Sequence, residues 1–203
     1  MQSMRRLFDI LGSAFALLIT SPLLLIVAVA IMIDSPGNPF YLARRSGKNG
    51  VVFRMWKFRT MVPDAWKLGP PITGGDDPRI TRLGRLLRRT KLDEMPQFIN
   101  VFTGDMSLVG PRPESPEIVA RYTSEQKKVL AAKPGVTGKV QLESGEESDL
   151  IPANEDAEEF YIRHLMDRKL RADIDYLEHR TVWSDFRILV STAMYVLRAV
   201  ARH

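Results

Sequence analysis

The sequence predicts an α-rich α+β fold: an N-terminal membrane helix, a small β-hairpin and amphipathic helices at the membrane interface. Three observations support this prediction. Residues 10–33 form an uncharged, mostly aliphatic run, and two short apolar segments flank a glycine-containing turn at residues 47–50. Two later segments, residues 80–87 and 183–200, repeat apolar residues at helical spacing.

The apolar run carries Ser21 and Pro22 at its midpoint. As a helix it would reach about 36 Å, enough to cross a hydrocarbon core of about 30 Å. Pro22 lacks an N–H and its ring collides with the carbonyl of Leu18, so it kinks or breaks a helix. Ser21 is a typical N-cap, which predicts a second helix starting here. Two half-length helices could enter one leaflet and return.

The residues alone leave three topologies open: a re-entrant helix, a kinked single span and a cleaved signal peptide. Arg5 and Arg6 precede the run and Arg44, Arg45 and Lys48 follow it, so the positive-inside rule does not separate its two ends. Both ends could therefore be cytoplasmic. The run is longer than the apolar region of a typical signal peptide, which argues against cleavage.

Length and composition fit one globular domain at residues 36–203 after a membrane segment at residues 1–35. The absence of cysteine excludes disulfides and thiolate sites, and the three histidines lack metal-ligand spacing. Any metal would then be a hard cation bound by carboxylates. The net charge of +5 is concentrated in a basic segment that indicates a polyanionic partner.

A hairpin is predicted from residues 40–43 and 51–56, which read as short strands on either side of the turn. Residues 69–78 are rich in glycine, proline and aspartate and are predicted to be a loop. The acidic stretch at residues 143–159 is predicted to be a solvated loop and the start of a helix.

The basic segment alternates aliphatic and basic residues in the pattern of an amphipathic helix. Its aliphatic residues are Ile80, Leu83, Leu86 and Leu87, and its basic residues are Arg79, Arg82, Arg85, Arg88, Arg89 and Lys91. It suits a lipid interface, although a surface helix of an ordinary globule has the same pattern. The aromatic and basic residues at 55–59 form too short a pattern to indicate nucleic-acid binding.

Asp93 and Glu94 directly follow the basic helix and are the best candidates for chemistry. Adjacent carboxylates do not share a helix face, so one could bind metal or attack phosphorus while the other handles a proton. We expect a depressed pKa for a carboxylate that follows several arginines, and Mg²⁺ bound there would attract a diphosphate. By itself an Asp-Glu pair is more often a solvated helix end.

Four other segments combine basic residues with tight turns. They are Lys-Phe-Arg-Thr-Met at 57–61, Gly-Asp-Met-Ser-Leu-Val at 104–109, Gly-Pro-Arg-Pro at 110–113 and Lys-Pro-Gly-Val-Thr-Gly at 133–138. In their order, with Asp-Glu-Met-Pro-Gln at 93–97 between the first and second, they resemble the monotopic phosphoglycosyl transferases, also called bacterial sugar transferases. The resemblance covers nearly the whole chain.

This resemblance implies an enzyme that moves a phosphosugar from a UDP-sugar to polyprenol (undecaprenyl) phosphate. The products are polyprenyl-diphosphate-sugar and UMP, made at the cytoplasmic face of the bacterial inner membrane. The resemblance also implies a re-entrant helix broken at Ser21 and Pro22, which anchors the domain in one leaflet. Without the additional helices of longer members, the chain resembles the minimal catalytic unit.

The resemblance also assigns roles to individual residues. Asp93 is expected to be the nucleophile that forms a covalent phosphosugar intermediate and to bind Mg²⁺, and Glu94 to assist the lipid phosphate. Substrate binding is expected of Lys57, Arg59, Arg88, Arg112 and Pro113. For Lys57 and Arg59, structural pairing with carboxylates is an equal alternative. Turn formation, rather than substrate contact, is the favoured role of Gly135 and Gly138.

A non-enzymatic scaffold that binds anionic lipids would also explain the charge and the apolar segments, but not the Asp-Glu pair or the turn motifs. Such a scaffold should tolerate Asp93→Asn, whereas a transferase should not. No motif in the sequence identifies the sugar, the polyprenol length or the oligomeric state.

Overall fold

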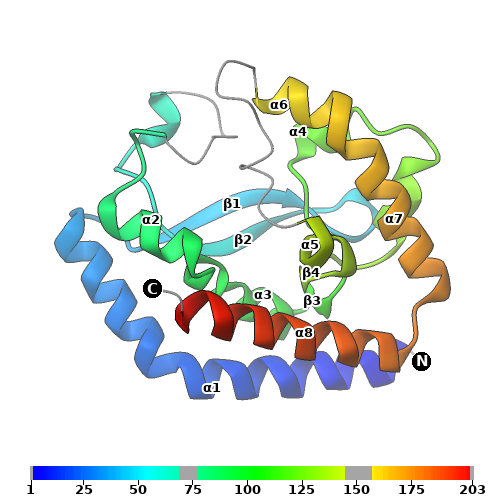
Figure 1. Cartoon of the computed structure of the whole chain (residues 1–203), viewed down its shortest axis with the longest axis horizontal. Helices are drawn as coiled ribbons and strands as arrows, with labels where there is room; N and C mark the ends of the chain where they lie inside the picture. The colour runs from blue at the N-terminus through cyan, green and yellow to red at the C-terminus, as the bar shows by residue number, and fades with distance from the viewer. Residues whose placement is uncertain (1, 69–76, 145–156, 202–203) are drawn as a thin grey trace.

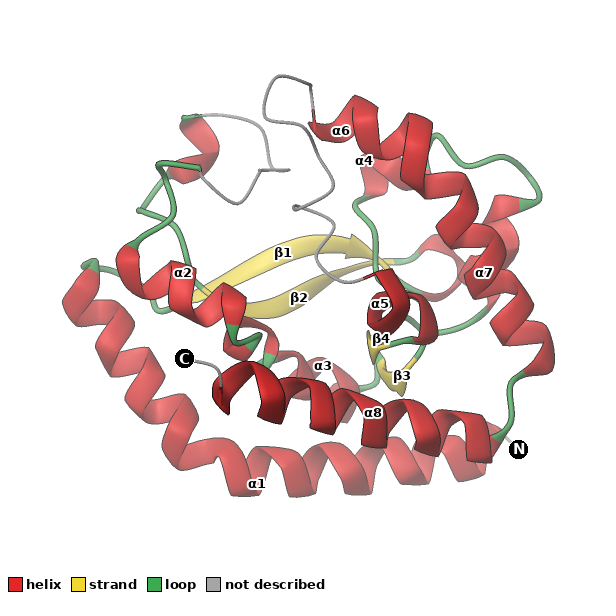
Figure 2. Ribbon diagram, viewed as in Figure 1, coloured by secondary structure: helices red, strands yellow, loops and turns green. Residues whose placement is uncertain are grey.

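The computed structural model describes residues 2–68, 77–144 and 157–201. Helices predominate, and the described strands form two pairs (Figure 2). In chain order the elements are α1 (Gln2–Asp34), β1 (Phe40–Ser46), β2 (Val52–Phe58), α2 (Arg82–Arg89), α3 (Gln97–Thr103), β3 (Ser107–Val109), α4 (Pro116–Val119), β4 (Gly135–Thr137), α5 (Lys139–Ser144), α6 (Ala157–Phe160), α7 (Met166–His179) and α8 (Val182–Ala201). Short 3-10 turns lie between them, namely η1 (Lys48–Gly50), η2 (Ala65–Lys67), η3 (Leu92–Glu94) and η4 (Gln126–Ala131), and a π-helical turn, η6 (Tyr161–Leu165), joins α6 to α7.

Helix α1 runs along one edge of the molecule and bends part-way along its length (Figure 1). Pro22 lies inside this helix and cannot donate to the carbonyl of Leu18, four residues earlier. The hydroxyl of Ser21 donates to that carbonyl instead, at 2.9 Å. The prediction that Ser21 caps a second helix is therefore wrong. Because the serine replaces the missing hydrogen bond, the helix bends without ending.

The first half of α1 is fastened to β3 by polar and apolar contacts. The carboxylate of Asp9 is buried and accepts hydrogen bonds from the hydroxyl of Ser107 and the backbone N–H of Leu108, both at 2.9 Å. Gly12 lies so close to Leu108 that a Cβ on it would come within 2.7 Å of that side chain. The second half packs into an apolar cluster made of Val27, Ala28, Ile31, Phe58 and Leu87.

The remaining face of α1 is apolar and exposed. Large aliphatic and aromatic side chains on it include Leu7, Leu11, Phe15, Leu18, Ile19, Leu25, Ile26 and Ile33. Within the described residues, Ser3–Asp34 is the one helix whose length and composition would allow it to cross a bilayer. Helix α8, predicted from the C-terminal apolar pattern, also exposes Trp183, Phe186, Val190 and Met194.

The predicted hairpin is confirmed and extends slightly beyond the predicted strands. Strands β1 and β2 pair antiparallel from Phe40 opposite Phe58 to Ser46 opposite Val52. Alternation along the strands turns one face of the hairpin into the main core. The buried members of this core are Ala43, Met55, Val101, Met106, Leu108, Val109, Tyr176 and Ile188.

The predicted basic helix is confirmed as α2. Its N-cap is Thr81, whose hydroxyl accepts a hydrogen bond from Gly84 N at 2.9 Å. Leu87 is fully buried, whereas Leu86 is exposed, so one side of the helix packs on the domain and the other faces outward. Most of the predicted loop at residues 69–78 and of the acidic stretch at 143–159 lies outside the described residues.

Candidate active site

The turn after α2 places Asp93 and Glu94. Lys91 adopts the left-handed conformation, with φ 59°, which costs about 1–2 kcal/mol in a residue that has a Cβ. The chain reverses there and enters η3, which runs into Met95, Pro96 and then α3. As a result Asp93 is 7% exposed, and the two adjacent carboxylates occupy different surroundings.

Two cations from distant parts of the chain hold Glu94. The ammonium of Lys57, in β2, lies 2.7 Å from Oε1 of Glu94, and Nη2 of Arg112 lies 3.5 Å from the same oxygen. By contrast, the side chain of Asp93 makes no hydrogen bond or ion pair with any residue in the described part of the chain. The buried carboxylate of Asp93 therefore lacks a direct partner, whereas Glu94 has two.

The two carboxyl groups consequently have opposite pKa shifts. Burial raises the pKa of Asp93 to about 6, against the opposing effect of Lys57 and with a further contribution from Glu94. Burial acts in the same direction on Glu94, but Lys57 and Arg112 outweigh it and hold the pKa of Glu94 well below its usual range. The expected depression by the preceding arginines is therefore wrong for Asp93, because Lys91 and Arg88 do not offset burial.

Arg88 and Arg59 have different positions relative to this pair. Arg88, in the last turn of α2, donates from Nε to the hydroxyl of Thr60 at 2.9 Å, and its charge lowers the pKa of Asp93. The guanidinium of Arg59 donates instead to the carbonyls of Ser35 and Pro36. The structure therefore brings Arg88 toward the carboxylates and uses Arg59 to hold the end of α1.

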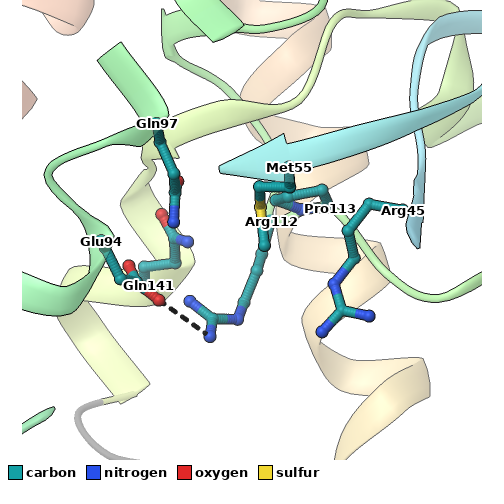
Figure 3. Close-up of a pocket in the computed structure, with 7 residues that line it drawn as sticks. All are labelled: Arg45, Met55, Glu94, Gln97, Arg112, Pro113 and Gln141. Atoms are coloured by element: carbon teal, nitrogen blue, oxygen red, sulfur yellow. Dashed lines mark hydrogen bonds and ion pairs between the residues drawn. The ribbon is translucent and has the colours of Figure 1, made fainter. Parts of the chain in front are cut away.

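A small pocket opens beside Glu94 (Figure 3). Arg112 and Pro113, two of the predicted substrate-binding residues, line it together with Glu94. The other lining residues are Arg45, Met55, Gln97 and Gln141. Strand β1, strand β2, α3 and α5 thus all contribute side chains to one opening, although they are far apart in the sequence.

Close backbone contacts hold the segment that carries Arg112. Gly110 N donates to the carbonyl of Thr137, and Gly135 N donates to the carbonyl of Pro111, both at 2.9 Å. A Cβ on Gly135 would lie 2.1 Å from Gly110 N, so only glycine fits there. Gly135 and Gly138 therefore serve chain packing, in agreement with the favoured interpretation from the sequence.

No cluster of three carboxylates or histidines that could hold a metal occurs among the residues that the structure describes. A magnesium ion does not need one, because Mg²⁺ is often bound by one or two carboxylates together with substrate phosphates and water. Asp93, a buried carboxylate without a partner in the described chain, is the residue that fits this role.

Comparison with known proteins identifies the family of the chain. A sequence model of the bacterial sugar transferase family matches residues 1–199. The chain belongs to this family.

Relatives of this bacterial sugar transferase include curated enzymes. UDP-glucose:undecaprenyl-phosphate glucose-1-phosphate transferase of Caulobacter vibrioides is 36% identical over 207 residues, which covers 95% of this chain and 69% of the relative. The Escherichia coli protein of the same name is 36% identical over 93% of this chain and 39% of its own length. Galactosyl transferase CpsE of Streptococcus agalactiae is 35% identical over 95% and 42%, respectively. The chain thus spans less than half of the last two relatives.

Several pocket residues of this sugar transferase are not singled out by the sequence. In the sequence, Arg45 is only one of several basic residues that follow the apolar run. Strand alternation is the signal that separates it from Arg44, because neighbouring residues of β1 point to opposite faces. Gln97 ends the Asp-Glu-Met-Pro-Gln block, but Gln141 has no signal in its own segment, since its place depends on how α5 packs.

Proposed function

We propose that this chain is a phosphoglycosyl transferase that moves a phosphosugar from a UDP-sugar to undecaprenyl phosphate. The products would be polyprenyl-diphosphate-sugar and UMP, which opens the assembly of a surface glycan. The observation that carries the proposal is Asp93, a buried carboxylate without a partner in the described chain, beside Glu94 with its two cations. The names of relatives in Caulobacter vibrioides and Escherichia coli, which include UDP-glucose and undecaprenyl phosphate, support it.

In the first step the carboxylate of Asp93 attacks the β-phosphorus of the UDP-sugar. A bond forms between a carboxylate oxygen and that phosphorus, the bond from the phosphorus to the oxygen bridging the α-phosphate breaks, and UMP leaves with the bonding electrons. A carboxylate without a hydrogen-bond partner is a better nucleophile than one stabilised by cations. This difference favours Asp93 over Glu94 as the attacking group.

In the second step a phosphate oxygen of undecaprenyl phosphate attacks the same phosphorus. The bond between this phosphorus and the Asp93 oxygen breaks, which regenerates the carboxylate and releases polyprenyl-diphosphate-sugar. We propose that Glu94 assists by holding Lys57 and Arg112 toward the phosphates, because a carboxylate with a strongly lowered pKa is a weak base. The cations themselves would stabilise the charge that develops on the phosphoryl oxygens.

The remaining predicted substrate contacts follow from position. Arg88 approaches Asp93 from α2 and would bind phosphate oxygens, while Pro113 shapes the pocket beside Arg112. Mg²⁺ bound at Asp93 would neutralise the repulsion between an anionic nucleophile and an anionic diphosphate. Asp93 would thus act first as a ligand that orients the diphosphate and then as the nucleophile.

We also propose that α1 is a re-entrant anchor in the cytoplasmic leaflet of the bacterial inner membrane, bent at Ser21 and Pro22. Two observations support this proposal. The bend keeps its hydrogen bonding through Ser21, which matters because lipid offers no alternative partner. The outward side of α1 is apolar, and Trp183 and Phe186 of α8 are exposed, as expected for side chains at an interface.

The test measures UMP release from a panel of UDP-sugars in detergent with undecaprenyl phosphate and Mg²⁺. Wild type is compared with Asp93→Asn and with Glu125→Gln, which removes an exposed carboxylate paired with Lys128. We expect release by wild type and by the control, loss of about a thousandfold or more in Asp93→Asn, and a phosphosugar adduct on intact wild-type protein when the acceptor is omitted. Unchanged UMP release by Asp93→Asn would contradict the mechanism. If none of the three proteins released UMP, a lipid-binding scaffold would be favoured.

A further inference from the structure

Arg45 is a half-buried cation that lacks a carboxylate partner. It lies on β1 beside the exposed Arg44, and its guanidinium donates to the carbonyl of Arg44 at 3.1 Å. No carboxylate in the described ranges 2–68, 77–144 and 157–201 lies within ion-pair distance of it. Burial lowers the pKa of Arg45; the nearby Glu114 opposes this effect, Arg112 adds to it, and the arginine stays charged at neutral pH. A desolvated charge without a partner is costly unless a ligand compensates it.

Arg45 and Arg112 face the same pocket. In Figure 3 both side chains extend downward, Glu94 meets the guanidinium of Arg112 from the left, and the two glutamines lie on that same left side. The charge of Arg112 acts unfavourably on Arg45, and Glu94, the carboxylate among the residues that line the pocket, also pairs with Lys57. A phosphate oxyanion between the arginines would remove this repulsion, and each planar guanidinium can bind two of its oxygens.

A second observation concerns the other side of the pocket. The side-chain oxygen Oε1 of Gln141 is buried and accepts no hydrogen bond from the residues that the structure describes, and a buried acceptor without a donor is destabilising in the absence of a ligand. The ligand that fits this pocket therefore carries an N–H or O–H group as well as an oxyanion. A nucleotide-sugar has both, whereas the phosphate of a polyprenol has no such donor once it is ionised.

We propose that Arg45 and Arg112 form a paired-arginine site for a phosphate group of the nucleotide-sugar donor, and that Gln141 accepts a hydrogen bond from its sugar or base. This inference rests on the proposed function and extends it. Arg45 is a binding residue in this scheme, distinct from the nucleophile. It holds the donor's phosphates beside Glu94, next to the carboxylate that attacks.

The experiment measures UDP binding by calorimetry on the full chain in detergent, followed by KM for a UDP-sugar and for undecaprenyl phosphate. Arg45→Gln is compared with Arg44→Gln, which removes the same charge from the next residue of the same strand, on its outward side. Arg45→Lys keeps the charge without the fork, and Gln141→Leu removes the unpaired oxygen. Thermal unfolding of each protein shows whether it folds.

We expect Arg45→Gln to weaken UDP binding by about tenfold or more, Arg45→Lys to recover part of that loss, and Arg44→Gln to bind UDP like wild type. Gln141→Leu should raise KM for the UDP-sugar although its thermal stability is unchanged or higher. If the wild type is active and Arg45→Gln binds UDP as tightly as Arg44→Gln does, this inference is wrong while the proposed function stands.

Two further results are decisive. If Arg45→Gln raises KM only for undecaprenyl phosphate, the paired arginines bind the acceptor and the assignment to the donor is wrong. If the wild type releases no UMP from any UDP-sugar, the proposed function fails and this inference fails with it.

Discussion

Asp93 and Glu94 are neighbours in η3, but compensating charge reaches only one of them. Glu94 has Lys57 at 2.7 Å and Arg112 at 3.5 Å, whereas Asp93 is buried without a partner in the described chain. The cations stabilise the negative charge of Glu94, whereas burial makes the negative charge of Asp93 unfavourable. The difference teaches that a reactive carboxylate can be created by giving the available cations to its neighbour.

The largest effect on this comparison is expected from Glu94→Gln. It leaves the half-buried Lys57 without its counterion, so we expect the free energy of unfolding to fall by about 2–3 kcal/mol. Chemical denaturation of the detergent-solubilised protein measures this change.

The double variant Lys57→Met with Glu94→Gln is the control for that prediction. It removes both charges of the pair and should be less destabilised than the sum of the single variants. If the two single changes are simply additive, the ion pair does not contribute and the contrast between the two carboxylates is weaker than the distances indicate.

Asp93→Asn should change stability in the opposite direction. The pKa of Asp93 is raised from an ordinary 3.8 to about 6, so the ionised group destabilises the folded protein above pH 6. As the pH falls from 6 toward 4 the group becomes protonated in the folded state and the cost shrinks, and well below pH 4 the group is protonated in both states and the cost disappears. We expect Asp93→Asn to raise the free energy of unfolding by about 2–3 kcal/mol at pH 8 and by much less at pH 4, as measured by denaturation at both values.

The same raised pKa predicts the pH dependence of UMP formation. In a first turnover without acceptor and with Mg²⁺ below saturation, the rate should fall as the pH drops through about 6, approaching about tenfold per pH unit below it, because protons then compete with Mg²⁺ for the Asp93 carboxylate. Omitting undecaprenyl phosphate removes the titration of the acceptor's own phosphate. A rate that stays flat down to pH 4.5, in protein that remains folded, would show that Asp93 is not the group being titrated.

Thr60→Val gives the smallest expected effect. It removes the hydroxyl that holds Nε of Arg88, so we expect a loss of about 1 kcal/mol of stability and a slight rise in the midpoint of the pH profile as Arg88 moves away from Asp93. Thr60→Ser keeps the hydroxyl and should match wild type. Equal behaviour of the valine and serine variants would mean that Thr60 does not position Arg88.

Local patterns in the sequence predict the hairpin, the basic helix and the C-terminal helix because each depends on periodicity within one segment. They do not predict the pair β3 and β4, since it joins short strands that are distant in the chain through contacts of Gly110 and Gly135. The continuity of α1 is also missed. It depends on a hydroxyl of Ser21 that can either cap a new helix or bond backward to Leu18, and the sequence contains both options.

For the site, the motifs bring out Lys57, Asp93, Glu94 and Arg112, which the fold gathers around one turn. The sign of the pKa shift at Asp93 is missed because sequence proximity to arginines says nothing about burial. The position of Arg59, a predicted substrate-binding residue, also depends on tertiary packing. Its guanidinium reaches the end of α1, and that contact depends on how a distant helix packs against β2.

The attachment of α1 to β3 has a consequence for the design of a water-soluble form of this protein. Deleting the first 35 residues would remove Asp9 and leave the hydroxyl of Ser107 and the N–H of Leu108 without this acceptor. It would also expose Phe58 and Leu87. A more promising engineering route keeps the helix and replaces only its outward residues, such as Phe15 and Ile19, with polar ones. The inward side of α1 is part of the interior of the catalytic domain that we propose.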